Sequence, residues 1–421
     1  MTLSTTSSTT ETRPAHHTPS GRPRARALGI PLDGAPGPWN AITDVPGVEI
    51  GHVTLIEGEG VRTGVTALLP RGCAGVGAPC AAGWYSLNGN GEMTGTTWIE
   101  ESGGFNLPIA LTNTHAVGAV HTGVDQWVAE HHPRLAAQWM LPVVAETWDG
   151  YLNDINGRHV HPEHAIAAIE SAASGPLEEG SVGGGTGMNC YGFKGGSGTS
   201  SRVVGYGPDT WTIGALVQAN FGERRELVVA GVPVGRSLLD DNPLDDDEWL
   251  QLDLAGAPGR VPGGAGSVIV VLGTDAPLLP GQCKALARRA ALGLARTGTN
   301  GGHFSGDIFL AFSTANDGAL NSTFPQGEPT GDEYDNLRFV PWCRIDPFYE
   351  AAVQCVEEAV LNALVANEPM TGRQGHRTPA LPHDRVRILL RLLRQWRSRS
   401  RHQCTTIPAC ERAKARNTPT A

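Results

Sequence analysis

The stretch GGAGSVIVVLGTDAPLLP (residues 263–280) changes character within a few positions. Four small residues, three of them glycine, are followed by Ser267 and then by the apolar run Val268–Leu272. A short continuous run rich in β-branched residues is typical of a strand buried on both faces. The sequence therefore predicts a central strand that begins with a serine and follows a flexible loop.

A serine in this position has a route to catalysis. A serine hydroxyl is a weak nucleophile until a base takes its proton. If the peptide bond before Ser267 were cut, the new α-amine would lie on the same residue, and its ordinary pKa of about 7.7–8.0 suits a general base. Self-cleavage also favours glycine at position 266, where a strained backbone without a Cβ is expected. The alternative is a serine that only ends a loop, and the local context does not separate the two.

Composition limits the class of protein. The 421 residues suffice for one large domain or two ordinary ones, and a net charge of −10 argues against nucleic acid as a partner. The 55 glycines are about twice the average share of about 7%, which favours a site built from loops. No apolar run approaches the roughly 18 residues that span a bilayer, and the N-terminus lacks the apolar core of a signal peptide. We expect a cytoplasmic protein with no membrane span.

Three regions differ in composition. Residues 1–38 are rich in Ser, Thr and Pro and are predicted to be disordered. Residues 39–388 are expected to form a single domain, within which the acidic segment Ser237–Asp253 is predicted to be an exposed loop. Residues 389–421 form a basic tail. It could be an amphipathic helix for a membrane surface or an acidic partner, but a solvated extension is favoured.

Strands and helices can be placed coarsely within the domain. Ser201–Tyr206 and Trp211–Asn220 flank a turn and predict a hairpin, and Val268–Gly273 and Asp307–Ser313 predict further strands. Residues 280–297 predict a helix ended by Gly298, and a second helix opens at Asp346 and Pro347. The mixture indicates a layered α/β protein.

Two further segments carry chemistry-bearing residues. The glycine-rich segment Gly183–Arg202 contains Lys194 but lacks the GxxxxGK[ST] pattern, so it indicates close backbone approach, not phosphate binding. His159, His161 and His164 have the spacing of metal ligands, yet surface histidines at a helix start are favoured and no metal is expected. The eight cysteines lack a CxxC pair, and several are expected to be reduced, buried thiols.

A series of motifs, in order, carries a family resemblance. They are ITDVPGVEIGHVTL, NGNGEMTGTTWIEESG, LTNTHAVGAV, GGGTGMNCYGFKGGSGTSSR, VQANFG, VIVVLGTDAPLLP and SGDIFLAFST. From about Ile42 to His383 the chain resembles the self-cleaving aminopeptidases, which include the L-aminopeptidase/D-amino-acid esterases and the β-peptidyl aminopeptidases. The resemblance implies an αββα sandwich, similar to the N-terminal nucleophile hydrolases but with different connectivity. It also implies a precursor that splits into two chains, which stay together, commonly as a homotetramer.

The resemblance assigns roles to particular residues. Cleavage falls between Gly266 and Ser267, which makes Ser267 the nucleophile and divides the domain into a larger chain to 266 and a smaller chain from 267. Asn220 matches the side chain that helps to stabilise the oxyanion. Ser305 and Asp307 match residues that hydrogen-bond around the nucleophile and its amine.

Substrate recognition and the departures from the family also follow from the resemblance. Glu146 matches the acid that pairs with the free amino group of a substrate. Trp148 stands where esterase/amidase members often have tyrosine, so a hydrogen bond from that hydroxyl is lost. His303 and Phe304 are larger than is common and are expected to reshape the pocket. The implied reaction releases N-terminal amino acids from short peptides, amides or esters and needs no cofactor. Either the α-amine or the Ser305–Asp307 pair would activate the nucleophile.

Three rival functions remain. One is a self-processing acyltransferase of the glutamate N-acetyltransferase kind, against which Ser267 counts because those proteins use threonine at the cleavage point. Another is a metallohydrolase built on His159, His161 and His164. The third is a binding protein that never processes at Ser267.

Overall fold

The computed structural model describes residues 14–245, 248–254, 259, 264–325, 327–329 and 331–392. It divides into two units, Met1–Leu381 and Pro382–Ala421. In the second unit, residues 383–392 are helical. The remainder of the predicted basic tail lies outside the described residues, as do Cys404 and Cys410.

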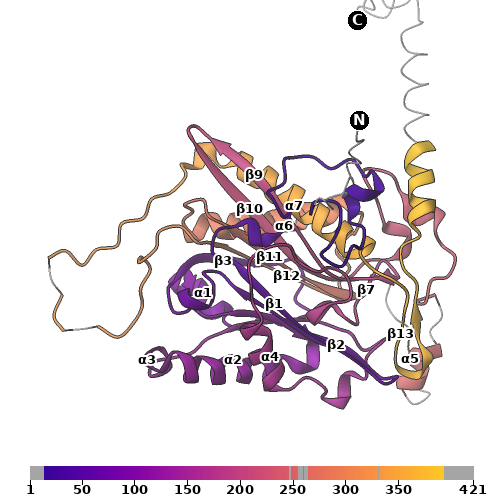
Figure 1. Ribbon diagram of the computed structural model, residues 1–421, viewed down its shortest axis with the longest axis horizontal. Coiled ribbons are helices and arrows are strands. Elements are labelled where there is room, and N and C mark those ends of the chain that lie inside the picture. The colour runs from indigo at the N-terminus through magenta and orange to yellow at the C-terminus, as the bar shows by residue number, and fades with distance from the viewer. Residues whose placement is uncertain are drawn as a thin grey trace, which may run out of the picture. The chain divides into compact units, whose positions relative to one another are not determined.

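Two sheets form the centre of the first unit (Figure 1). The smaller sheet has the order β1-β2-β5-β6 and the larger has the order β4-β3-β12-β11-β10-β9. Within them, β5–β6 and β11–β12 are parallel pairs and the other neighbours are antiparallel. The strands of the smaller sheet are β1 (Glu49–Glu57), β2 (Val61–Leu69), β5 (Ile109–Asn113) and β6 (Val143–Thr147). The strands of the larger sheet are β3 (Cys80–Ser86), β4 (Gly104–Phe105), β9 (Gly196–Tyr206), β10 (Asp209–Asn220), β11 (Gly266–Thr274) and β12 (Ser305–Ser313).

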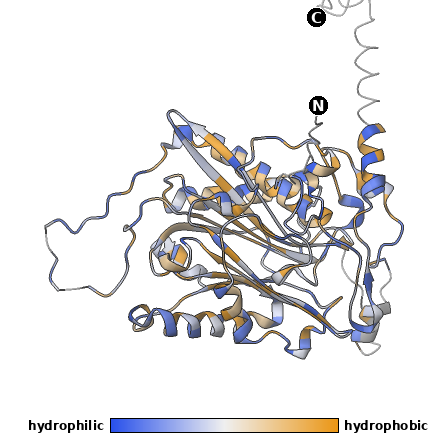
Figure 2. Cartoon of the chain, in the orientation of Figure 1, coloured by the Kyte–Doolittle hydropathy of each residue, from blue (hydrophilic) through white to orange (hydrophobic). Residues whose placement is uncertain are grey.

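Helices cover the outer face of each sheet. Helices α6 (Pro280–Arg296) and α7 (Asp346–Val365) pack on the larger sheet, and α2 (Val117–His131) and α4 (Pro162–Glu170) pack on the smaller one. One apolar core joins the inner faces of the two sheets and a second lies under α2 and α4. Hydrophobic and hydrophilic residues mix along these helices, as expected for helices with one buried face (Figure 2). The predicted αββα sandwich is confirmed.

Short elements complete the unit. They are α1 (Thr96–Ser102), α3 (Pro133–Ala136) and α5 (Glu248–Asp253), and the two-residue strands β7 (Asn189–Cys190), β8 (Phe193–Lys194), β13 (Met370–Thr371) and β14 (Arg377–Thr378). Within the described residues, no helix combines the length and the apolar character needed to cross a bilayer.

The predicted central elements are present and mostly longer than expected. The hairpin is formed by β9 and β10, and residues 268–272 of β11 are completely buried. Helix α6 ends just before Gly298, whose φ of +108° is readily adopted only by glycine. Helix α7 begins at Asp346 itself, and the residue before it makes no side-chain cap.

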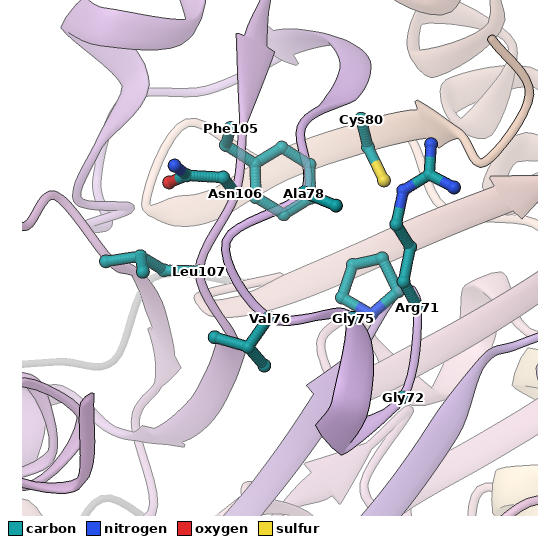
Figure 3. A pocket seen from close by; sticks show the side chains of 10 residues that line it. Arg71, Gly72, Gly75, Val76, Ala78, Cys80, Phe105, Asn106 and Leu107 are labelled. Atoms are coloured by element: carbon teal, nitrogen blue, oxygen red, sulfur yellow. The ribbon is translucent and has the colours of Figure 1, made fainter. Parts of the chain in front are cut away.

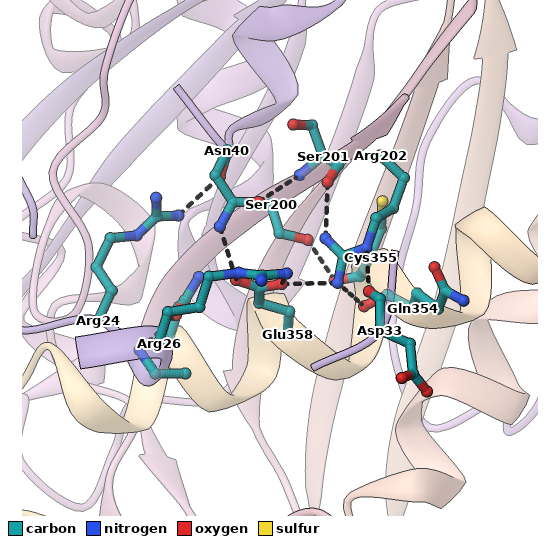
Figure 4. Close-up of polar contacts among 12 residues, drawn as sticks. Arg24, Arg26, Asp33, Asn40, Ser200, Ser201, Arg202, Gln354, Cys355 and Glu358 are labelled. Atoms are coloured by element: carbon teal, nitrogen blue, oxygen red, sulfur yellow. Dashed lines mark hydrogen bonds and ion pairs between the residues drawn. The ribbon is translucent and has the colours of Figure 1, made fainter. Parts of the chain in front are cut away.

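Residues 14–38 differ from the predicted disorder, because the buried Arg24 and the partly buried Arg26 fix them to the folded unit (Figure 4). Arg24 forms an ion pair of 2.6 Å with Glu179, and Arg26 forms one of 2.7 Å with Glu358 of α7. Glu358 also forms an ion pair of 2.7 Å with Arg202 of β9. Composition could not reveal this packing, because the buried partners of these arginines lie more than 150 residues away in the chain.

The acidic segment also differs from the exposed loop that was predicted. Leu238 is buried, and Trp249 of α5 is only 8% exposed. Trp249 packs edge-on against Tyr151, with 5.3 Å between ring centroids. The segment therefore contributes an aromatic side chain to the body of the unit, between runs of charged residues that mask its apolar character in the sequence.

Candidate active site

Ser267 lies at the start of β11, between β10 and β12. It pairs with Asn220 on one side and with Gly306 on the other. Its side chain belongs to the face that also carries Ile269 and Val271, which is the inner face of the larger sheet. The residue is 2% exposed, and its Oγ accepts a hydrogen bond of 3.2 Å from the backbone N–H of Trp148. The hydroxyl thus lies between the two sheets.

Gly266 is required for a steric reason. A Cβ at this position would lie 2.1 Å from the carbonyl oxygen of Asn220, which is backbone and cannot move aside. Its φ is outside the left-handed region, so the backbone strain expected from the sequence is not the reason for the glycine. Glycine here permits β10 and the residue before Ser267 to approach closely.

The amide of Asn220 is held in one orientation. Its Oδ1 accepts a hydrogen bond of 2.8 Å from the backbone N–H of Asn189, and its Nδ2 donates one of 2.8 Å to the carbonyl of Trp148. The side chain shares the face of Ser267, since the two residues pair directly. A second Nδ2 hydrogen remains for an oxygen bound beside Ser267.

Glu146 provides a buried carboxylate in the same cavity. It stands near the end of β6, is 2% exposed, and accepts hydrogen bonds from the Thr114 hydroxyl and, at 2.9 Å, from the Glu92 backbone N–H. Burial raises the pKa of Glu146, an effect that the two hydrogen bonds oppose. A carboxylate in such a place binds a cation favourably, because pairing offsets the cost of its burial.

Trp148 acts on the site through its backbone. Its N–H reaches Ser267 and its carbonyl reaches Asn220, so neither contact depends on the side chain. The indole is 36% exposed and lies 6.0 Å, between ring centroids, from Trp249. The substitution of tryptophan for tyrosine therefore leaves both backbone contacts to the site in place.

Ser305 and Asp307 form a hydrogen-bonded pair on the strand next to Ser267. The Ser305 hydroxyl donates to Asp307 Oδ1 at 2.5 Å, and Asn88 Nδ2 donates to Oδ2 at 3.0 Å. Side chains alternate along β12, and Gly306 is the residue that pairs with Ser267, so Ser305 and Asp307 point to the opposite face of the sheet. Neither residue lines the cavity. Burial raises the pKa of Asp307.

Most of the predicted residues line one cavity of about 460 Å³. This volume is typical of small-molecule sites. Its polar residues are Asn90, Glu92, Thr114, Glu146, Asn189, Asn220 and Ser267. Its apolar and aromatic residues include Trp148, Tyr151, Phe221, Leu244, Trp249 and Phe304. Sequence reasoning missed Thr114, Asn189 and Trp249. The first two lie inside motifs already recognised, whereas nothing local marks Trp249.

Other candidate sites are less suited to a substrate. The hollow beside Arg71, Cys80 and Phe105 has a volume of about 10 Å³, which is room for about one water molecule (Figure 3). Burial raises the pKa of the Cys80 thiol to about 11, so that thiol is not a nucleophile at neutral pH. Lys194, in the glycine-rich segment, is completely buried and cannot reach a phosphate.

The three histidines lie at a helix start, as predicted. His161 precedes Pro162, the first residue of α4, and its backbone N–H donates to His164 Nδ1 at 2.9 Å. His159 lies 3.7 Å from Asp154. In the part of the chain that the structure describes, no three His, Cys, Asp or Glu side chains are grouped to hold a metal ion.

The fold and the cavity define a class of protein. A solved structure of the L-aminopeptidase D-Ala-esterase/amidase from Ochrobactrum anthropi, described as a prototype for the serine aminopeptidases and a new variant of the Ntn hydrolase fold, matches with a TM-score of 0.79 and 46% identity. The match covers 88% of this chain and 99% of that one. A β-aminopeptidase from Burkholderia sp. matches with a TM-score of 0.76 and 47% identity, over 88% of this chain and 98% of that one. The chain therefore has a variant of the N-terminal nucleophile hydrolase fold.

The chain belongs to peptidase family S58, whose model matches residues 40–378. Among curated proteins, beta-peptidyl aminopeptidase BapA from Sphingosinicella microcystinivorans is 50% identical over 381 residues, which cover 89% of this chain and 93% of that protein. The protein of the same name from Sphingosinicella xenopeptidilytica is 43% identical over 88% of this chain and 91% of its own length. The resemblance inferred from the motifs is confirmed, and the protein is a hydrolase of the aminopeptidase class.

Proposed function

We propose that this protein matures by cutting its own chain between Gly266 and Ser267 and then releases N-terminal amino acids from short peptides, amides or esters. The observation that carries the proposal is one cavity that holds the Ser267 hydroxyl, the fixed Asn220 amide and the buried Glu146 carboxylate. No cofactor takes part in the proposed mechanism.

Maturation is an acyl shift followed by hydrolysis. The Ser267 hydroxyl attacks the carbonyl of Gly266 and the peptide bond breaks, which leaves an ester on Oγ and frees the nitrogen as an α-amine. Water then hydrolyses the ester to the Gly266 carboxylate and a free hydroxyl. The absence of a Cβ at Gly266 supports this step, because the bond lies against β10 where no side chain fits.

Turnover uses the same hydroxyl with the new amine as base. The neutral α-amine of Ser267 takes the hydroxyl proton while Oγ attacks the first carbonyl of the substrate. The Asn220 Nδ2–H stabilises the oxyanion, a contact worth about 2.7–4 kcal/mol in comparable sites. The proton passes to the leaving amine, and water hydrolyses the acyl-enzyme to release the amino acid.

Substrate selection combines a charge with an apolar wall. Glu146 would bind the free ammonium of the substrate, and N-blocked substrates would leave this buried carboxylate unpaired at a cost. The rings of Trp148 and Trp249 would receive the side chain of the released residue. The Ser305–Asp307 pair, on the other face of the strand, would act on the new amine through its charge and not on Oγ directly. This placement favours the α-amine as the activating base.

The remaining features of the proposal concern assembly and location. We propose that the two chains stay together in one domain and associate as a homotetramer. A cytoplasmic location is supported by the cysteines, because all six that the structure describes are free thiols, two of them exposed.

Gel electrophoresis under denaturing conditions tests the proposal. Purified protein should give two chains, the smaller starting at Ser267 by N-terminal sequencing, and it should hydrolyse aminoacyl p-nitroanilides. Ser267→Ala should remain one inactive chain, whereas Ser200→Ala, a matched change of a completely buried serine on β9, should process normally. Cleavage of Ser267→Ala at the same bond would falsify the mechanism. A single wild-type band without hydrolysis would favour a binding protein, and acetyl transfer from N-acetylornithine would favour an acyltransferase.

A further inference from the structure

Lys194 is a completely buried lysine that no proposed step uses. It lies on β8, within the glycine-rich segment, and its Nζ donates to the backbone carbonyls of Met188, at 2.7 Å, and Gly195, at 2.8 Å. Burying an ammonium is costly unless it is hydrogen-bonded. The side chain therefore holds both carbonyls in fixed positions.

One of these carbonyls connects Lys194 to the cavity. The carbonyl of Met188 and the N–H of Asn189 belong to the same peptide group, and that N–H donates to Asn220 Oδ1 at 2.8 Å. Asn220 Nδ2 in turn donates to the carbonyl of Trp148. Hydrogen bonds in series polarise one another in a low-dielectric interior. The result is a continuous chain from the buried cation to the amide beside the nucleophile.

The orientation of the Asn220 amide decides whether it can help catalysis. With Oδ1 toward Asn189, Nδ2 faces the cavity side and can donate to an oxyanion; the flipped amide would present a carbonyl oxygen and repel it. The Asn189 N–H can only donate a hydrogen bond. It is therefore compatible only with the orientation in which Asn220 Oδ1 points toward Asn189. When Lys194 is protonated, its ammonium on the carbonyl of the same peptide group makes that N–H a stronger donor.

We propose that Lys194 is a positioning residue for acyl transfer, which fixes the Met188–Asn189 peptide and through it the productive orientation of the Asn220 amide. This inference rests on the proposed function, since it gives Lys194 a role only if Asn220 stabilises the oxyanion.

The surrounding backbone does not depend on the Lys194 side chain. The Lys194 N–H donates to the carbonyl of Pro379 at 2.8 Å, and Asn367 Nδ2 donates to the Lys194 carbonyl at 3.1 Å. The Gly195 N–H also donates to the carbonyl of Met188 at 2.9 Å. Lys194→Met, of similar length and without charge, is therefore expected to fold.

A double-mutant cycle with Asn220→Ala tests the proposal. Lys194→Met should lower kcat about tenfold, as expected for the loss of one charge-assisted hydrogen bond, with KM nearly unchanged. In the Asn220→Ala background the same change should alter kcat less than about twofold, because the amide it positions is gone. Lys194→Gln, which retains a neutral donor, should lie between Lys194→Met and the wild type.

Arg202→Met provides the matched control. Arg202 is a buried cation of β9 that pairs with Glu358 away from the cavity, so its loss should lower the melting temperature while leaving kcat of the folded protein unchanged. Equal loss of kcat from Lys194→Met in both Asn220 backgrounds, or an equal loss from Arg202→Met, would overturn the proposal. An Asn220→Ala variant with wild-type kcat would instead overturn the role of Asn220 in the proposed function.

A measurement on the unaltered Lys194 keeps the proposal testable if Lys194→Met fails to fold. Burial lowers the pKa of Lys194 to about 7, and the ionisable groups that act on it are Cys190, whose pKa is raised by burial, and Asp149, whose pKa is raised to about 7. In protein labelled with ¹⁵N-asparagine, the Asn189 amide and the Asn220 side-chain amide should shift together near pH 7. In Asp149→Asn the shift should remain but move to lower pH, because the Asp149 carboxylate raises the pKa of Lys194. Two amides that do not shift together, or a shift that disappears in Asp149→Asn, would contradict the proposal.

Discussion

Replacing Glu146 by glutamine tests how the cavity selects a free amine. The carboxylate accepts from the Thr114 hydroxyl and the Glu92 N–H. The glutamine carbonyl can retain the bond from the Glu92 N–H while its Nε2 donates to the Thr114 hydroxyl, which can also accept. The fold and self-cleavage should therefore survive, because maturation involves an internal peptide without an ammonium.

Hydrolysis of free-amine substrates should fall in Glu146→Gln. At a site that is 2% exposed, the substrate ammonium loses a charge-assisted bond of about 1.5–3 kcal/mol, which corresponds to a fall of roughly 10- to 150-fold in kcat/KM. Because burial raises the pKa of Glu146, the wild type should also lose kcat/KM as the pH falls through that raised pKa and the carboxylate becomes protonated. Glu146→Gln should lack this acidic limb.

The assay compares free and N-acetylated forms of one aminoacyl p-nitroanilide. The wild type should strongly prefer the free amine, and Glu146→Gln should lose most of that preference. Glu100→Gln is a suitable control, since Glu100 pairs with Lys284 on the surface with a half-exposed side chain. If Glu146→Gln kept the wild-type preference for the free amine, another group would have to bind the ammonium.

Three other changes probe the base, the apolar wall and the buried charges. Asp307→Asn should shift the rising limb of the pH profile of kcat/KM to lower pH, because a carboxylate near the Ser267 amine stabilises its ammonium form. Comparing two substrates with different amine pKa values separates the titration of the enzyme from that of the substrate. A rising limb that does not move in Asp307→Asn would contradict this role of Asp307. Trp249→Leu should raise kcat/KM for phenylalanyl relative to alanyl substrates about tenfold; a proportional fall for both would show that Trp249 does not set side-chain size. Burial raises the pKa of Asp149 to about 7, so the contribution of Asp149 to the free energy of unfolding falls as the pH rises from 5 to 7. In urea titrations of an uncleaved Ser267→Ala background, the change in the free energy of unfolding from pH 5 to pH 7 should be more favourable by about 2 kcal/mol in Asp149→Asn than in its parent, and an equal change in both would contradict the raised pKa.

The sequence by itself determined the central strand, its hairpin neighbour and the serine at the start of that strand. These features depend on local patterns: the β-branched run after Ser267, the turn between β9 and β10, and a series of motifs that needs no knowledge of contacts. Ser267, Asn220, Glu146 and Trp148, which the resemblance singled out, all line one cavity.

Only the tertiary structure decided which side of the central strand each residue faces. The motif SGDIFLAFST predicted both strand β12 and the site residues Ser305 and Asp307. The register of β12 against β11, however, points both side chains away from the cavity. A shift of one residue in that register would reverse the result, and the register depends on packing between strands that are far apart in sequence.

The tertiary structure likewise decided the roles of residues whose partners are distant. Arg24 appeared to belong to a disordered segment, Trp249 to an exposed acidic loop and Lys194 to a glycine-rich loop of close backbone approach. Each is buried, because hydrogen bonds, ion pairs or ring contacts supplied by other elements offset the cost of its burial. Composition averages over neighbours in the chain, whereas burial depends on neighbours in space.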